Sequence, residues 1–278
     1  MERPSMRLSA LLIYPVKSLR GCSVSFSEVD SLGLVGDRRF MVVDESGRFV
    51  TQRTLPKMAL IDTALSTSEL TLSHAEYGQV SVSTGRNAAA AARSVSVWGS
   101  TELSAEDCGE EAADWLGEVL SFRCRLVRIG ERFRRPVIRG GGGRDDLVSF
   151  ADAFPVLILG ESSLAELNDR LISAGNDAMT LERFRPNLVF SGGEPFDEDH
   201  WHRFRIGPMT FRASGPCARC TITTINPDTG ERDFEPLRTL ATYRRDPTNT
   251  SEINFGQNLV HETKSGTLRL GDPIEILG

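Results

Sequence analysis

Two thiols three positions apart are the residues with the clearest capacity for chemistry. Cys217 and Cys220 enclose an alanine and Arg219. A neighbouring guanidinium favours the thiolate, which is both the nucleophilic form of cysteine and the form that binds metals. The pair is consistent with half of a zinc site completed by His200 and His202, with a redox dithiol, or with one metal-binding cysteine beside a packed neighbour.

The predicted surroundings of these thiols weigh against the first two interpretations without removing them. A β-branched run over residues 221–225 predicts a strand, whereas a redox dithiol typically precedes a helix. The two histidines fall on a different predicted segment, and their spacing to the cysteines is not a familiar zinc-finger spacing. The residues alone therefore leave all three interpretations open.

A second group of residues has the donors that bind anions. Its members stand where predicted strands end or begin, and they are Lys17, Ser18, Arg38, Arg39, Arg185 and Asn187. Each alone is typical of a solvated loop or a structural ion pair. As a set they could hold a large anionic ligand that carries a phosphate and polar ring edges. Whether they meet depends on the fold.

The bulk composition is that of a globular enzyme and argues against several other classes. The 278 residues include 32 Lys+Arg and 38 Asp+Glu, and the net charge of −6 argues against a general nucleic-acid binder. No apolar run approaches the roughly 20 residues of a membrane span or resembles a signal peptide. Five cysteines are too few for a disulfide scaffold. We therefore expect a cytoplasmic protein that does not associate with membranes.

The elements that must position these residues are mostly short strands. Alternating or β-branched runs predict them over residues 8–16, 24–29, 40–43, 48–51, 60–65, 70–73, 80–83, 95–97, 102–104, 156–159, 187–190, 203–206, 209–212, 221–225, 258–261 and 274–277. Three helices are predicted, over 110–120, from a capping box at Ser163 and Glu166, and from Pro236. This mixture predicts a mainly β chain of the α+β class, with barrels or sandwiches decorated by helices.

Two further segments interrupt the pattern of strands. The alanine run at 88–92 predicts a loop or a brief helical turn. The stretch 130–146 is rich in glycine and arginine, which predicts a mobile segment acting as a lid or as a connection between domains.

Several short motifs follow one another along almost the whole chain. They are Ile-Tyr-Pro-Val-Lys-Ser (13–18), Gly-Asp-Arg-Arg-Phe (36–40), Asp-Cys-Gly (107–109), Phe-Pro-Val-Leu-Ile-Leu (154–159), Phe-Arg-Pro-Asn (184–187), Cys-Ala-Arg-Cys (217–220), Asn-Pro-Asp-Thr-Gly (226–230) and Phe-Gly-Gln-Asn (255–258). With this set the chain resembles MOSC-domain proteins, in the group of the mitochondrial amidoxime-reducing component and its YcbX-like bacterial relatives. The resemblance implies an N-terminal MOSC-associated β domain over 1–127, packed on a C-terminal MOSC β-barrel over 128–278.

The resemblance also implies a molybdenum cofactor, a molybdopterin whose dithiolene holds the metal, with a protein thiolate as a further ligand. The family position of that ligand falls on Cys220, and Cys217 would be its non-ligating neighbour. Cofactor contacts are implied for Lys17, Ser18, Arg38, Arg185, Asn187 and Asn258. Some relatives have hydroxyl residues where this chain has Ala153 and Phe154, so only backbone contacts are expected there.

The implied activity is the reduction of N-hydroxylated small molecules, in which N–OH becomes N–H and the oxygen leaves as water. Many YcbX-like relatives carry a ferredoxin-type iron–sulfur domain, and this sequence lacks its cysteine cluster. We therefore expect electrons from a separate protein, of ferredoxin, flavodoxin or cytochrome b5 type with its reductase. The alternatives are an oxotransferase for another N- or S-oxide, a carrier of the cofactor or of sulfur without turnover, and a zinc-stabilised binding module.

Overall fold

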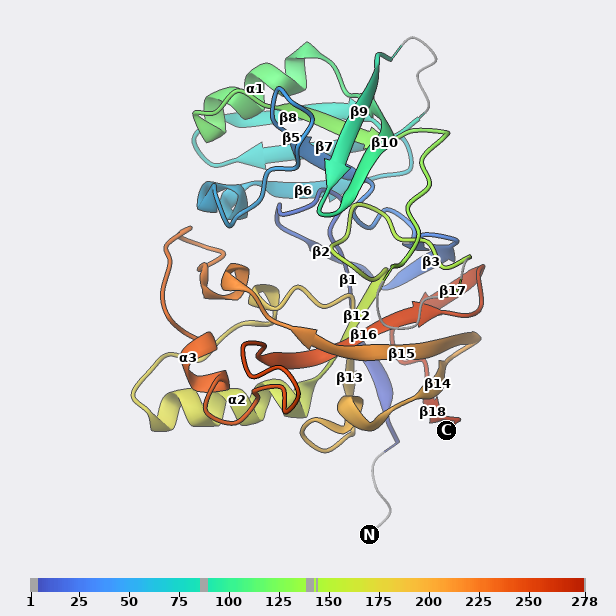
Figure 1. The fold of residues 1–278 in the computed structure, drawn as a ribbon, viewed down its shortest axis with the longest axis vertical. Helices are drawn as coiled ribbons and strands as arrows, with labels where there is room; N and C mark the ends of the chain where they lie inside the picture. The colour runs from blue at the N-terminus through green and yellow to red at the C-terminus, as the bar shows by residue number, and fades with distance from the viewer. Residues whose placement is uncertain (1–4, 86–89, 139–142, 144, 278) are drawn as a thin grey trace.

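The strands of the chain gather into two bodies, one above the other in Figure 1. The computed structural model describes residues 5–85, 90–138, 143 and 145–277. Strands outnumber helices in both bodies, which confirms the predicted mainly β class. Within these residues, no helix is both long enough and apolar enough to span a membrane.

The upper body contains two antiparallel sheets and a helix. Its elements are β5 (Phe40–Val43), β6 (Asp62–Leu65), β7 (Glu69–His74), β8 (Gly78–Ser83), β9 (Ala92–Val97), β10 (Ser100–Asp107), α1 (Glu110–Leu120) and β11 (Arg125–Ile129). The sheets have the orders β5-β11-β10-β9 and β6-β7-β8. The apolar face of α1 packs on both sheets through Leu116 and Val119, as its helical spacing predicts.

The lower body is built on one eight-stranded sheet. Its strands are β1 (Arg7–Ile13), β2 (Cys22–Ser23), β12 (Val156–Gly160), β13 (Leu188–Ser191), β14 (Arg203–Ile206), β15 (Met209–Ala218), β16 (Asn254–His261) and β18 (Ile274–Ile276). They lie in the order β18-β14-β15-β16-β12-β13-β1-β2, with β12 and β13 parallel. The helix α2 (Glu161–Ser173) forms the crossover that a parallel pair requires. The short helix α3 (Leu237–Leu240) follows Pro236, as predicted.

The first strands of the chain belong to this lower body. β1 pairs antiparallel with β13 on one side and with the edge strand β2 on the other. A fourth sheet joins β3 (Phe26–Asp30) and β4 (Gly33–Leu34) to β17 (Gly266–Arg269) near the other end of the sequence. Strands from both sides of the predicted boundary at residue 127 thus share hydrogen-bonded sheets.

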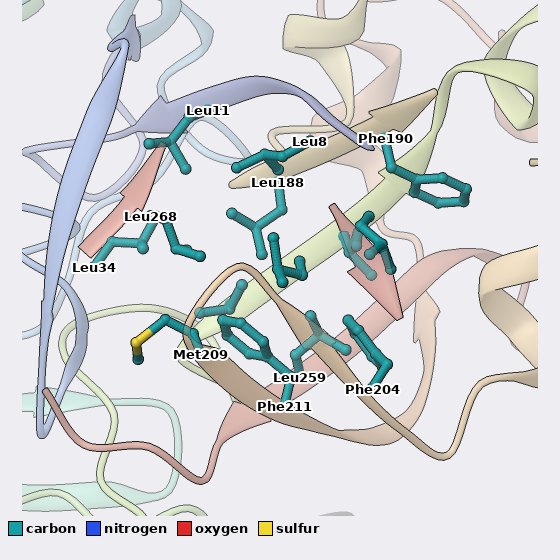
Figure 2. Packing of buried hydrophobic residues seen from close by; sticks show 14 of the residues in the cluster. Leu8, Leu11, Leu34, Leu188, Phe190, Phe204, Met209, Phe211, Leu259 and Leu268 are labelled. Carbon is teal, nitrogen blue, oxygen red and sulfur yellow. The ribbon is translucent and has the colours of Figure 1, made fainter. Parts of the chain in front are cut away.

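An apolar cluster fixes the register of these strands (Figure 2). Its labelled members are Leu8, Leu11, Leu34, Leu188, Phe190, Phe204, Met209, Phe211, Leu259 and Leu268, and all are at most 1% exposed. Because successive residues of a strand point to opposite faces, a shift by one residue would expose this whole set. The core therefore holds β13, β15 and β16 in fixed register, and their ends carry the candidate site.

The strand predicted over residues 221–225 is wrong. The chain forms a 3-10 helix, η4 (Thr221–Thr224), directly after Cys220. The hydroxyls of Thr223 and Thr224 donate to the carbonyl oxygens three residues earlier, at 3.0 and 2.8 Å. Such local bonds give threonine an alternative to the ladder of a sheet. Cys220 therefore stands at the start of a tight turn, while Cys217 lies on β15.

The predicted capping box at Ser163 and Glu166 is also wrong. α2 begins at Glu161, and Ser163 lies inside its first turn. The Ser163 hydroxyl donates to the buried Glu198 carboxylate at 2.9 Å, while Glu166 pairs with Arg170 on the next turn. Glu198 also accepts a bond from the Gly160 amide. The Glu198 carboxylate, which comes from another segment, thus lies at the positive N-terminal end of the helix. The spacing of residues within the helix could not predict this contact.

The two interrupting segments fall partly outside the described residues. This applies to part of the predicted loop at 88–92 and to part of the predicted lid at 130–146. In the described flanks of the latter, Arg135 and Val137 are buried. Pro136 forms an isolated bridge with Leu147. These flanks are therefore fixed to the body of the protein.

Candidate functional site

All seven residues with implied cofactor contacts line one cavity of about 140 Å³. They are Lys17, Ser18, Arg38, Arg185, Asn187, Cys220 and Asn258. They come from the turn after β1, the loop before β5, the entry to β13, the segment between β15 and η4, and the middle of β16. The fold therefore brings together residues that are far apart in the sequence. Their contact with a cofactor stays a prediction.

The two thiols at this cavity have separate guanidinium partners. Arg53 donates from Nη2 to the Sγ atom of Cys220 at 3.1 Å, and Arg219 donates from Nη1 to the Sγ atom of Cys217 at 3.1 Å. Both cysteines are half-buried and free of disulfides. No group of three or more His, Cys, Asp or Glu residues within the described ranges is placed to hold a metal ion. The zinc interpretation, which needs His200 and His202 at these sulfurs, therefore has no support.

Two arginines enclose a buried tyrosine on one wall of the site. The guanidinium carbons of Arg38 and Arg185 lie 4.3 and 4.2 Å from the centroid of the Tyr14 ring. The ring is 1% exposed, and its hydroxyl donates to the carbonyl oxygen of Pro186. Cations over an aromatic face are stabilised by its quadrupole, more so when they are desolvated. Tyr14 thus holds two like charges close together.

Asp37 and Asn187 complete this wall from beneath. The 2% exposed Asp37 carboxylate accepts both bonds of Arg38 Nη1, at 2.8 and 2.7 Å, and one from the Asn187 amide at 3.0 Å. The Asn187 oxygen in turn accepts from Arg38 at 3.0 Å. Since both ends of its amide are bonded inside the protein, Asn187 positions Arg38 at the cavity.

Arg185 differs from Arg38 in having no carboxylate partner among the hydrogen bonds of the described residues. Nη1 of Arg185 donates to the Leu19 carbonyl, and Nη2 is buried without a partner in the described part of the chain. Burial, and then the nearby Arg38, lower the pKa of the Arg185 guanidinium to about 10. A buried donor without a partner is costly, so this atom suits an anionic ligand in the cavity.

Strained backbone is concentrated at the same place. Ser18, Arg38 and Arg185 have φ angles of 65°, 47° and 55°, in the left-handed region that residues with a side chain rarely adopt. Such conformations persist only where the surrounding structure enforces them, and they cluster at functional sites. Here, three residues with this backbone conformation line the same cavity.

The sequence did not reveal three further residues of the site. The Asp152 carboxylate pairs with Lys17, accepts from Arg53 at 3.0 Å and accepts from the Trp98 indole at 3.1 Å. Arg53 and Trp98 come from loops of the upper body, and Asp152 precedes β12. No spacing links them. The one feature of the sequence that could have pointed to Asp152 is its neighbour Ala153, which the resemblance places near the cofactor.

Two family models match the chain in succession. The MOSC N-terminal beta barrel domain matches residues 5–123, and the MOSC domain matches residues 145–275. The chain belongs to the MOSC-domain family. It is 36% identical to mitochondrial amidoxime-reducing component 1 of Mus musculus, over 98% of this chain and 82% of the relative. The human protein of the same name is also 36% identical, over 98% and 83%.

A further relative is similar over most of the chain. Mitochondrial amidoxime reducing component 2 of Bos taurus is 34% identical over 96% of this chain and 82% of its own length. Among solved structures, the YUAD protein of Bacillus subtilis covers 99% of this chain and 96% of its own, with a TM-score of 0.40 and 13% identity. A likeness at that level carries no argument about function.

The cavity joins parts of both matched regions. The MOSC domain, as matched, contributes Arg185, Asn187, Cys220 and Asn258, and the N-terminal region contributes Lys17, Ser18 and Arg38. The N-terminal residues of the cavity follow β1, which pairs with a MOSC-domain strand. The MOSC site is therefore composite.

Lys17 and Asp152 form a charged pair in the lining of the MOSC cavity. Burial lowers the pKa of the Lys17 ammonium to about 8, although the Asp152 carboxylate opposes this shift. Burial would raise the pKa of Asp152, but Lys17 and Arg53 outweigh it and hold that pKa well below its usual range. At neutral pH the pair is ionised.

The Lys17 shift predicts how stability depends on pH. Because the folded pKa of about 8 lies below the ordinary 10.5, the unfolded chain holds more protons between these values. The contribution of Lys17 to the free energy of unfolding should therefore rise with pH in this window, by up to about 1.4 kcal/mol per pH unit. Urea unfolding of wild type and Lys17→Met between pH 7 and 10 should show this rise only in the wild type. Parallel curves would contradict it.

Proposed function

We propose that this chain is a reductase of N-hydroxylated small molecules that works with a molybdenum cofactor. The observation that supports the proposal is that the half-buried thiol of Cys220 and six further residues at family cofactor positions line one cavity. The names of the relatives, amidoxime-reducing components, supply the substrate class.

The described residues fit such a cofactor by their chemistry. Four cations line the cavity, Lys17, Arg38, Arg185 and Arg219, against the single carboxylate of Asp152. This excess suits a ligand with a phosphate and a polar ring system. The unpartnered Arg185 Nη2 is one atom that such a ligand would satisfy. Cys220 would supply the thiolate, which is a suitable ligand for a soft, redox-active metal.

When bound, the cofactor would supply oxygen-atom acceptance and two-electron chemistry. The residues of the chain would bind, orient and provide protons. Arg38 and Arg185 would hold the anionic part, while Asn187 and Asp37 keep Arg38 in place. Lys17 carries a proton at the cavity, and a pKa of about 8 lies in the range where a general acid works well near neutral pH. The oxygen leaves as water, and the electrons would come from a separate redox protein.

Metal and cofactor analysis of the purified protein tests this proposal. We expect molybdenum near one atom per chain and a fluorescent pterin on oxidative release. The loaded protein should reduce an aryl amidoxime with a chemically reduced dye as electron donor. Zinc in place of molybdenum would contradict the proposal. Bound cofactor without turnover would indicate a carrier, and turnover only of N-oxides or S-oxides would indicate another oxotransferase.

A further inference from the structure

Arg53 is the centre of a contact set that joins the two bodies. From one atom, Nη2, it donates to Cys220 Sγ at 3.1 Å and to Asp152 Oδ2 at 3.0 Å. Its guanidinium lies 4.8 Å from the centroid of the Trp98 ring. Arg53 and Trp98 belong to the upper body, whereas the sulfur and the carboxylate belong to the lower. The contact is therefore made across the boundary between the bodies.

The guanidinium has little freedom to leave this position. Its side chain is 21% exposed. The Trp98 indole, which packs against it, is itself bonded to the same carboxylate at 3.1 Å. A planar cation held by a carboxylate on one edge and by an aromatic face loses little further entropy when it also bonds the sulfur. The bond to Cys220 is thus part of a pre-organised arrangement.

The neighbouring thiol provides a comparison within the same molecule. Arg219 donates to Cys217 at the same distance of 3.1 Å, but its other bond goes to the carbonyl oxygen of Phe184. Both sulfurs therefore have a guanidinium donor, and the donor of Cys220 comes from the other body. If one sulfur binds a metal, the arginine bonded to that sulfur should affect the metal more than the other arginine does.

We propose that Arg53 is a positioning residue that orients the Cys220 sulfur and draws electron density from it, which raises the reduction potential of a metal bound there. The inference rests on the proposed function, since it takes Cys220 as the ligand. A hydrogen bond from a cation stabilises the extra negative charge that a ligand sulfur carries in the reduced state, and this favours reduction. The N-terminal domain would thus tune the site as well as enclose it.

The test is a redox titration of the molybdenum-loaded protein, followed by the electron paramagnetic resonance signal of Mo(V). We expect Arg53→Met to lower the midpoint potential and to change the Mo(V) signal. Arg53→Lys, which keeps the charge but not the planar donor, should give an intermediate potential. Arg219→Met removes the arginine at Cys217, which also lines the cavity, so in loaded protein it should shift the potential less than Arg53→Met does. Thermal unfolding and molybdenum content are measured for each variant.

Each outcome has a defined meaning. A wild-type potential in loaded Arg53→Met overturns the inference and leaves the proposed function intact. A shift in Arg219→Met, with none in Arg53→Met, overturns both the inference and the assignment of Cys220 as ligand. Wild-type protein without molybdenum overturns the proposed function and this inference with it. Should Arg53→Met fail to fold or load, Arg53→Lys decides: a lowered potential supports the inference, and a wild-type potential overturns it.

Discussion

Cys220→Ala is expected to abolish reduction of an N-hydroxylated substrate by artificial electron donors. The substitution removes the thiolate proposed to bind the metal. Even residues that only support a ligand typically cost 10- to 100-fold in metal affinity or activity, so losing the ligand should cost more than about 100-fold. Steady-state assays with a reduced dye, together with molybdenum content per chain, provide the measurement.

Cys217→Ala is the matched control for this result. Cys217 is also half-buried at the cavity and also accepts a bond from an arginine at 3.1 Å, so the two variants differ chiefly in which sulfur is lost. We expect Cys217→Ala to retain measurable activity. An inactive Cys217 variant beside an active Cys220 variant would reverse the ligand assignment.

Asp37→Asn is expected to be the most destabilising single change at the site. The Asp37 side chain is 2% exposed and bonds the Arg38 guanidinium, the Asn187 amide and the backbone amide of Tyr14. Removing the charge leaves the largely buried Arg38 guanidinium without its carboxylate, and breaking a buried pair in this way costs about 3–5 kcal/mol. Urea unfolding of the purified variant measures the cost.

The neighbouring pair of Arg39 and Asp30 is a matched control for the Asp37 experiment. Arg39 directly follows Arg38 in the chain; its side chain is 15% exposed, and the Asp30 side chain is 46% exposed. Because water solvates the half-exposed Asp30 carboxylate, Asp30→Asn should cost less than Asp37→Asn, on the order of 1 kcal/mol of the free energy of unfolding. If the two substitutions lower the free energy of unfolding equally, the burial of Asp37 is not the cause of the large expected cost. Lower molybdenum content in Asp37→Asn would further link the network to cofactor binding.

The parts of the fold that sequence could predict are those fixed by local pattern. α1 has the predicted bounds because its apolar residues recur at helical spacing, and most strands lie within a few residues of the alternating runs. The segment after Cys220 was mispredicted because threonine side chains bond the backbone of their own turn. The start of α2 was mispredicted because Glu198, which serves it, is distant in the sequence.

Some residues of the candidate site could be predicted from the sequence, and others could not. Cys220, Lys17 and Arg185 could be singled out because they stand in ordered motifs whose sequence resembles a family. Arg53 and Trp98 could not, because nothing in a local pattern shows that two loops of one body reach a carboxylate and a sulfur of the other. Only the tertiary structure shows that Arg53 has a partner at the site.

The pairing of β1 with β13 has a consequence for how the chain is made. Ser9 on β1 bonds the Val189 carbonyl, 180 residues further along. At typical rates of synthesis, about 5–20 residues per second, β1 waits roughly 10–40 s for its partner to leave the ribosome. Lys17 and Arg38 follow that strand, so their half of the cavity takes shape only when β13 arrives. A nascent chain halted before residue 188 should leave its first strand open to protease.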